Sequence, residues 1–293
     1  MRVVVTGGRG LVGRAVAEHC AAVGDEVLSY GHKDLDISDR DAVRQVILGN
    51  RPDVVINCAA WTNVDGCESD EQKAFAINAS GPENLARACR EAKCEFITIS
   101  TDYVFDGRKS GFYTQLDEPN PESVYAASKL EGERLSAQAY DRSIIVRSGY
   151  IFGAGGTNFL STVVSRAQRG EKLRAIADMY GTPTYANDLA ERLRELAEVN
   201  IPGIYHVVNS GPGVSFEEFT RKAVALMGNS DAVIEPVSLE ALDRPAKRPR
   251  NSRLRCLLSE QLALPPLRDW ERALEDFVGF VLFCGYSPER TMS

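Results

Sequence analysis

Short runs of apolar residues alternate with amphipathic segments through the first half of the chain. The apolar runs are continuous, which is typical of strands buried on both faces of a sheet. Strands that alternate with helices predict a parallel sheet with right-handed crossovers. The expected strands cover residues 2–6, 26–30, 54–60, 95–100 and 143–148, and the expected helices 14–23, 40–48, 72–92 and 125–139.

After residue 150 the alternation weakens, which indicates a second, smaller lobe. Its expected elements are a helix from Asn158 to 169, extended chain at 173–176 and 178–185, a helix capped by Asn187 and Asp188, a strand at 203–208, a helix capped by Ser215, and a closing helix at 269–283. We therefore expect an α/β protein with a Rossmann-type doubly wound parallel sheet in residues 1–150. Residues 151–293 would form mainly a C-terminal α/β lobe, with some later segments returning to the sheet.

A glycine-rich loop follows the first strand. Glycine at every third position lets the turn close tightly and lets backbone N–H groups approach a diphosphate at the start of the next helix. Between a strand and an amphipathic helix, this pattern favours a dinucleotide site over a plain tight turn. The loop residues expected to contact the cofactor are Gly7, Arg9, Gly10, Leu11, Val12 and Gly13.

The end of the second expected strand bears on which dinucleotide would bind. A free ribose 2′-hydroxyl usually meets an Asp or Glu there, but this chain has His32 and Lys33, and its first carboxylate is Asp34. Lys33 and Arg9 would suit a 2′-phosphate, although each would equally suit a solvated surface. We therefore expect NADP(H) as the preferred cofactor, with NAD(H) as the alternative.

Tyr125 and Lys129 lie four residues apart, so they share one face of an expected helix. A lysine ammonium favours the phenolate, so we expect Lys129 to lower the pKa of Tyr125 from its usual value of about 10. The hydroxyl of Thr101, at the end of a strand, would hold a substrate oxygen against the phenol. These three residues predict a site that moves a proton to or from a carbonyl or alcohol oxygen.

Composition narrows the class of protein. The chain has 293 residues and a formal charge of −7, which argues against general binding to nucleic acids or membrane surfaces. Its seven cysteines are scattered without a C-x-x-C pair or a His/Cys cluster, so we expect reduced thiols and no metal site. Because no apolar run approaches the ~20 residues of a membrane helix and the first strand begins at once, we expect a cytoplasmic protein.

Six basic residues gather between positions 244 and 255. In an acidic chain such a cluster suggests a multiply charged anion, such as a sugar-nucleotide diphosphate. For any single residue, a solvated surface position is the simpler explanation. The six are Arg244, Lys247, Arg248, Arg250, Arg253 and Arg255.

The combination of motifs resembles the extended short-chain dehydrogenase/reductases and, within them, the dTDP-4-dehydrorhamnose reductase family. The resemblance runs from the first strand to about Trp270. The segments that carry it are TGGRGLVG at 6–13, DVVINCAAWTNVD at 53–65, STDYVFDG at 100–107, Tyr125-x-x-x-Lys129 and RPRNSRL at 248–254.

This resemblance implies a reaction and a set of contacts. NADPH or NADH would deliver hydride to C4 of a dTDP-linked 4-keto-6-deoxy sugar, in dTDP-rhamnose and cell-wall polysaccharide synthesis. Tyr125 would give the proton, Lys129 would lower the pKa of Tyr125 and hold the nicotinamide ribose, and Thr101 would position the carbonyl. The family pattern would also place Asp36, Ile37, Ala59, Ala60 and Thr62 at the cofactor and Val64, Asp102, Tyr103, Tyr150, Asn158, Arg248 and Asn251 at the substrate.

The chain departs from the family pattern at a few positions. Tyr150 stands where the family commonly has tryptophan, which would alter packing over the sugar. Ala15 stands where a glutamate of the family's magnesium-linked dimer would lie, so we do not expect that metal, and a homodimer stays open. Ala126 replaces a common glycine, but the spacing from tyrosine to lysine is intact.

Three other readings remain from the sequence. A 4,6-dehydratase or epimerase on the same fold would need a carboxylate pair after the threonine, and here Tyr103 occupies the position of the glutamate. The chain also resembles the NADP-binding regulatory subunit of methionine adenosyltransferase, which would tolerate loss of the catalytic residues that this chain retains. A 4-ketoreductase for another nucleotide-linked deoxysugar would keep the chemistry and change the sugar.

Overall fold

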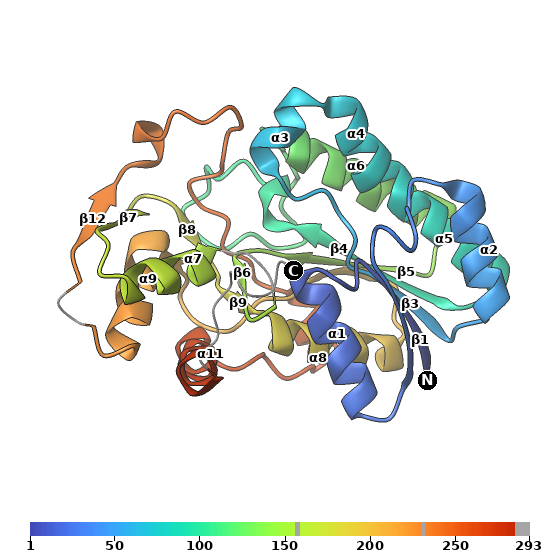
Figure 1. Cartoon of the computed structure of the whole chain (residues 1–293). Helices are drawn as coiled ribbons and strands as arrows, with labels where there is room; N and C mark the ends of the chain where they lie inside the picture. Colours follow the sequence, from blue (N-terminus) through green and yellow to red (C-terminus); the bar gives the residue numbers. More distant parts are fainter. Residues whose placement is uncertain (156–158, 230–231, 285–293) are drawn as a thin grey trace.

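The computed structural model describes residues 1–155, 159–229 and 232–284, and a parallel six-stranded sheet lies at the centre of this part of the chain (Figure 1). The strand order is β2-β1-β3-β4-β5-β10. This confirms the expected α/β class with a doubly wound parallel sheet. The strands are β1 (Arg2–Thr6), β2 (Glu26–Tyr30), β3 (Val54–Asn57), β4 (Glu95–Thr101), β5 (Ser143–Ser148) and β10 (Gly203–His206).

Helices cover both faces of the sheet, which explains why its central strands carry runs of buried apolar residues. Val3 and Val5 of β1 are buried with residues of α1 (Leu11–Ala22) and α8 (Ala186–Val199). Val4, between them, is buried on the opposite face with residues of three further helices. These are α2 (Arg40–Asn50), α5 (Gly81–Ala92) and α6 (Val124–Ala139) (Figure 1).

The strand order changes direction beside β1. The chain passes from β1 to β2 on one side and then to β3 on the other side of β1. In open α/β sheets, ligands bind in the crevice at the carboxyl ends of the strands where the order reverses. The glycine loop follows β1 at this point, and Gly7 takes a left-handed backbone conformation with φ of 68°.

The segment between β3 and β4 is more helical than expected. Helix α3 (Val64–Ser69) lies between the strand expected at 54–60 and the helix expected at 72–92. Helix α4 (Glu71–Phe75) then leads through a π-helical turn (Ala76–Ser80) into α5. The side chain of Asn78, in that turn, accepts from the backbone N–H of Trp61 and donates to its carbonyl oxygen. The turn therefore fixes the chain that leaves β3 toward the ligand edge.

The second lobe is built from pairs of short strands and three helices around an aromatic core. Phe152, Phe219, Trp270 and Phe277 are all buried in this core. The pairs are β6 (Ile151–Phe152) with β9 (Thr184–Tyr185), β7 (Leu173–Ile176) with β12 (Ile234–Val237), and β8 (Tyr180–Gly181) with β11 (Val214–Ser215). The helices are α7 (Phe159–Gln168), α9 (Phe216–Leu226) and α11 (Trp270–Cys284).

One expected cap is confirmed and one is wrong. Ser215 caps α9 in a reciprocal arrangement with Glu218. Helix α8 instead begins after Tyr185, so Asp188 lies in its first turn, where it accepts hydrogen bonds from Asn209 and Arg268. The chain also forms α10 (Leu257–Gln261) and 3₁₀ turns at Asp102–Val104 and Leu239–Ala241. In the described ranges, no helix is both long and apolar enough to span a bilayer.

Candidate active site

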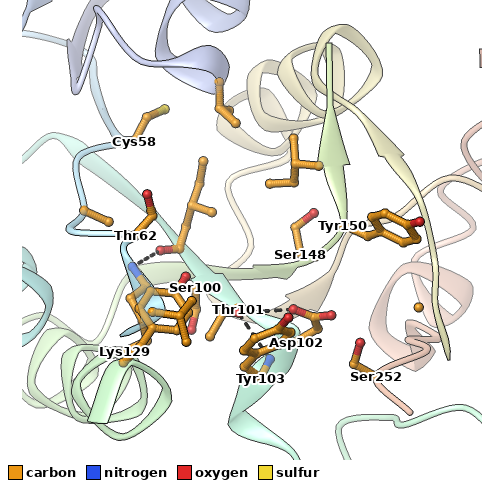
Figure 2. Close-up of a pocket in the computed structure, with 18 of the residues that line it drawn as sticks. Cys58, Thr62, Ser100, Thr101, Asp102, Tyr103, Lys129, Ser148, Tyr150 and Ser252 are labelled. Carbon is orange, nitrogen blue, oxygen red and sulfur yellow. Dashed lines mark hydrogen bonds between the residues drawn. The ribbon is translucent and has the colours of Figure 1, made fainter. Parts of the chain in front are cut away.

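A cavity of about 420 Å³ lies where the carboxyl ends of β4 and β5 meet the second lobe (Figure 2). Ser100 and Thr101 enter it from β4, and Tyr125 and Lys129 enter it from α6. The second lobe contributes its opposite wall, with Met179, Gly181, Phe216 and Ser252. The three residues expected to catalyse the reaction therefore line one cavity.

Thr101 is held in place by its own neighbours. Its hydroxyl accepts from the backbone N–H of Tyr103 at 3.2 Å and donates to a carboxylate oxygen of Asp102 at 3.1 Å (Figure 2). The side chain of Thr101 also acts to lower the pKa of the Tyr125 phenol, so the two groups are close to each other. The threonine and the tyrosine thus present two hydroxyl groups to the same point of the cavity.

Tyr125 occupies the first turn of α6, just after the Ser123 cap. Its ring meets that of Tyr103 edge to face, with centroids 6.2 Å apart. Burial raises the pKa of Tyr125, and the side chain of Thr101 opposes this shift without cancelling it. The pKa of this phenol is therefore raised in this structure, opposite to the net lowering that the position of Lys129 led us to expect, and burial is the largest cause.

Lys129 is buried one turn further along α6. Its ammonium donates to the carbonyl oxygen of Ile99 at 2.7 Å. Burial lowers the pKa of Lys129 to about 8, while the carboxylate of Glu133 opposes that shift. At neutral pH the side chain therefore still carries most of its charge.

Asp102 is a buried carboxyl group on the cavity wall. Burial raises its pKa to about 6, while the nearby side chain of Ser252 and the hydrogen bond from Thr101 oppose the rise. Gly149 packs directly against this carboxyl, since a Cβ atom there would lie 2.1 Å from the Asp102 Cγ atom. The space for Asp102 therefore depends on glycine at position 149.

A second cavity, of about 370 Å³, runs from the glycine loop to the end of β2. It shares Cys58, Ala59 and Ala60 with the first cavity, so the two are neighbouring parts of one cleft. The expected cofactor residues that line it are Gly7, Arg9, Gly10, His32, Asp36, Ile37, Ala59 and Ala60. Val12 and Thr62 line the first cavity instead, together with the expected substrate residues Val64, Asp102, Tyr103 and Tyr150.

Three expected cofactor residues line neither cavity. Leu11 packs against the core beneath the sheet, and Lys33 is exposed. Gly13 acts through packing, because a Cβ atom there would lie 2.2 Å from the carbonyl oxygen of Gly7. The exposed Arg9 reaches Asp34 at 3.2 Å, so a carboxylate lies beside the arginine at this end of the cleft.

Two expected substrate residues also line neither cavity. Arg248 makes a two-pronged ion pair with Asp65, and Asn251 donates to the carbonyl oxygens of Lys109 and Gly111. Each holds a loop of the protein, and the substrate contact expected for each stays a prediction. Asn158 lies outside the described residues.

The basic cluster at 244–255 is largely paired within the protein. Arg244 also pairs with Asp65, and Arg255 pairs with Glu260. Arg250 contacts Asp178 and Glu240, while Arg253 donates to the side chain of Asn251 and to backbone carbonyls. The basic cluster thus joins the two lobes and nearby loops through ion pairs with carboxylates and hydrogen bonds to carbonyl oxygens elsewhere in the protein.

Several cavity residues carried no recognised signal in the sequence. Ser148 ends an expected strand and Gly149 follows it, so their place at the carboxyl edge of the sheet follows from the same rule as that of Thr101. Met179, Phe216 and Ser252 come from the second lobe and reach the cavity only through long-range packing. Phe216 stacks on Tyr150 with ring centroids 3.9 Å apart.

Comparison with known proteins places this geometry in a family. The family described as the RmlD substrate binding domain matches residues 1–282. The chain belongs to this family. This confirms the family membership that the sequence motifs indicated.

Individual relatives cover nearly the whole chain. The dTDP-4-dehydrorhamnose reductase of Mycolicibacterium smegmatis is 38% identical over 284 residues, which cover 96% of this chain and 86% of the relative. A probable dTDP-4,6-dihydroxy-2-methyloxan-3-one 4-ketoreductase of Streptomyces antibioticus is 32% identical over 292 residues, covering 99% of each chain. The crystal structure of Bacillus anthracis dTDP-4-dehydrorhamnose reductase with NADP is 33% identical and has a TM-score of 0.91, covering 94% of this chain and 98% of that one.

Proposed function

We propose that this chain is an NADP(H)-dependent reductase that converts the C4 ketone of dTDP-4-dehydrorhamnose to a hydroxyl group. One observation carries the proposal: Thr101, Tyr125 and Lys129 line a single cavity that adjoins the cleft of the glycine loop. Similarity to reductases with this substrate supports the choice of sugar nucleotide. In this proposal residues 1–150 bind mainly the cofactor and residues 151–293 mainly the substrate.

Both the size of the cleft and the backbone groups that line it fit a dinucleotide. Gly10 precedes α1 without any side-chain cap, so the first N–H groups of that helix are available to a diphosphate. A Cβ atom at Gly7 would lie 2.6 Å from the backbone of Ala59, so only glycine lets the loop pack this closely against the end of β3. Arg9 would meet a 2′-phosphate, which favours NADP(H) over NAD(H).

The cavity residues have complementary parts in the reduction. A nicotinamide cofactor in the cleft would supply the hydride for C4. Thr101 holds the carbonyl oxygen beside Tyr125, and Tyr125 donates its proton as that oxygen becomes an alkoxide. The buried phenol keeps its proton at neutral pH, yet it still protonates an alkoxide, which is a much stronger base. Lys129 stabilises the phenolate that remains through its positive charge.

Replacement of Tyr125 by phenylalanine tests this assignment. Tyr125→Phe should reduce the rate of substrate-dependent NADPH oxidation by about 10²–10⁴-fold, the usual contribution of a general acid, and leave NADPH affinity within about twofold. A matched control is Tyr205→Phe, which removes a buried phenol hydroxyl bound to the carbonyl oxygen of Ile201, outside both cavities. The assignment is wrong if Tyr125→Phe and the control have equal turnover.

A different deoxysugar is the second candidate substrate. The Streptomyces antibioticus relative is named as a probable 4-ketoreductase for another dTDP-linked sugar. In this chain the stacked pair of Tyr150 and Phe216 forms one wall of the cavity and would face the sugar. Turnover of other dTDP-linked 4-keto sugars, compared at equal concentrations, would separate the two substrates by their kcat/KM.

The setting of the protein is also a matter of proposal. Within the described residues six cysteines are free thiols, which suits the reducing cytoplasm that we propose for it. We propose a small-molecule sugar nucleotide as its partner, with no role for nucleic acid or a membrane. A homodimer is the further option, and light scattering of the purified protein would decide it.

A further inference from the structure

A buried ion pair lies directly behind the catalytic residues. Glu133 of α6 and Arg147 of β5 are each about 95% buried. The Nε atom of Arg147 donates to the two oxygens of Glu133 at 2.9 and 3.2 Å, and an Nη atom donates at 2.7 Å. Such a pair is costly to bury and, once formed, costly to break from one side.

The pair connects the elements that carry the catalytic groups. Glu133 lies one turn beyond Lys129 on α6, so the two side chains share a helix face. Glu133 also accepts a hydrogen bond from the hydroxyl of Ser100, the residue before Thr101. In the sheet, Ser100 and Thr101 of β4 stand opposite Arg147 and Ser148 of β5.

We propose that Glu133 is a positioning residue for the reduction, which keeps Lys129 charged and ties the catalytic face of α6 to the strand end that carries Thr101. The contacts of Arg147 and Ser100 with Glu133 fix the position of the carboxylate one turn from the ammonium. A neutral residue of the same shape would preserve much of the packing and remove the charge.

The charged and titratable neighbours of Lys129 define the size of the effect. Glu133 acts from α6 and Cys58 from the end of β3, and both raise the pKa of Lys129 against the lowering by burial. Tyr125 lies one turn back on α6, and Arg147 faces Glu133 from β5. Because the fields of separate charges add, loss of Glu133 alone should lower the pKa of Lys129 by roughly one unit, and loss of Glu133 together with Arg147 by less.

Glu133→Gln provides the test, with two readouts. In protein labelled with ¹³C-lysine, the Cε resonance that is absent from Lys129→Arg reports the titration of Lys129 directly. We expect its midpoint to fall by roughly one pH unit in Glu133→Gln, and the alkaline limb of kcat/KM for NADPH oxidation to move down with it. The double variant Glu133→Gln/Arg147→Met, which leaves no unpaired charge, should shift in the same direction and protects the test against failure of the single variant to fold.

A remote buried pair separates this effect from a loss of stability. Asp25→Asn breaks the pair of Asp25 with Arg194, whose side chains are 2% and 14% exposed, outside both cavities. It should lower the melting temperature and leave both Lys129 readouts unchanged. An unchanged Lys129 midpoint in Glu133→Gln and in the double variant would overturn the inference.

The kinetic readout rests on the proposed function, whereas the resonance does not. If the resonance shifts and no sugar nucleotide is reduced, the proposed function fails and the role of Glu133 in charging Lys129 stands. If turnover is normal and the midpoint is unchanged, the inference fails and the proposed function stands.

Discussion

Gly149→Ala should destabilise the folded protein, because the added methyl group overpacks the wall of the first cavity. The added Cβ atom would lie 2.1 Å from Cγ of Asp102 and 2.2 and 2.4 Å from its two oxygens. An ordinary contact between such atoms is about 3.5 Å, so the carboxyl group must move by about 1.4 Å. Asp102 is buried, and that movement breaks the hydrogen bond that it accepts from Thr101.

The size of this effect follows from two costs. Overpacking in a dense interior costs about 1–3 kcal/mol, and the lost hydrogen bond adds about 1 kcal/mol. We expect Gly149→Ala to lower the free energy of unfolding by about 2–4 kcal/mol, measured by urea denaturation. For a chain of this size the melting temperature should fall by roughly 5–10 °C.

A double-mutant cycle with Asp102→Ala checks the cause. Once the carboxyl group is absent, the new methyl group has room, so Gly149→Ala should cost less than about 1 kcal/mol in that background. The coupling between the two positions should therefore approach the full cost of the single variant. Additive effects of the two substitutions would refute the reasoning, because they would show that the methyl group does not displace Asp102.

Two further predictions concern the nucleotide loop and acid stability. In Gly13→Ala the new Cβ atom would lie 2.2 Å from the Gly7 carbonyl oxygen, so the affinity for NADPH, measured by fluorescence titration, should fall by about tenfold or more. The control is Gly49→Ala, because a Cβ atom at that position meets open space. Equal NADPH affinities of the two variants would contradict the packing argument. Arg194 and the N-terminal ammonium hold the pKa of Asp25 below its usual value, so the stabilisation by Asp25 is complete above the unfolded pKa of about 4 and is lost as pH falls through the lower, folded pKa. Asp25→Asn should therefore be less stable than wild type at pH 7 and lose less stability below pH of about 4 in urea titrations, and parallel pH curves would contradict this.

The sheet was predictable because its strands contain short apolar runs, which are typical of strands buried on both faces. The expected strands correspond closely to β1, β2, β4 and β5 for that reason, and β3 ends three residues early at Asn57. The helix start at Val64 was not predictable from the apolar pattern, since it depends on a cap by Asn63 and on the anchoring of Trp61 by Asn78. The spacing of apolar residues carries no information about such hydrogen bonds between side chains and the backbone.

The same limit applies to the substrate residues. Thr101 and Tyr125 line the cavity because the end of a parallel strand and the first turn of the next helix both lie at the ligand edge. The sequence does not show which acceptors within the protein Arg248 and Asn251 find, and their contacts with the substrate stay a prediction. Here those acceptors are Asp65 and the loop at Lys109–Gly111, which lie far away in the sequence.

The titration of the catalytic pair shows why burial has to be weighed before charge. Spacing alone suggests that Lys129 lowers the pKa of Tyr125, yet the same low-dielectric surroundings raise the pKa of the phenol and lower that of the ammonium to about 8. Both shifts favour the neutral forms, so a phenolate at Tyr125 is disfavoured before reaction. A phenol that keeps its proton suits a general acid, which must release it only when the sugar oxygen becomes an alkoxide.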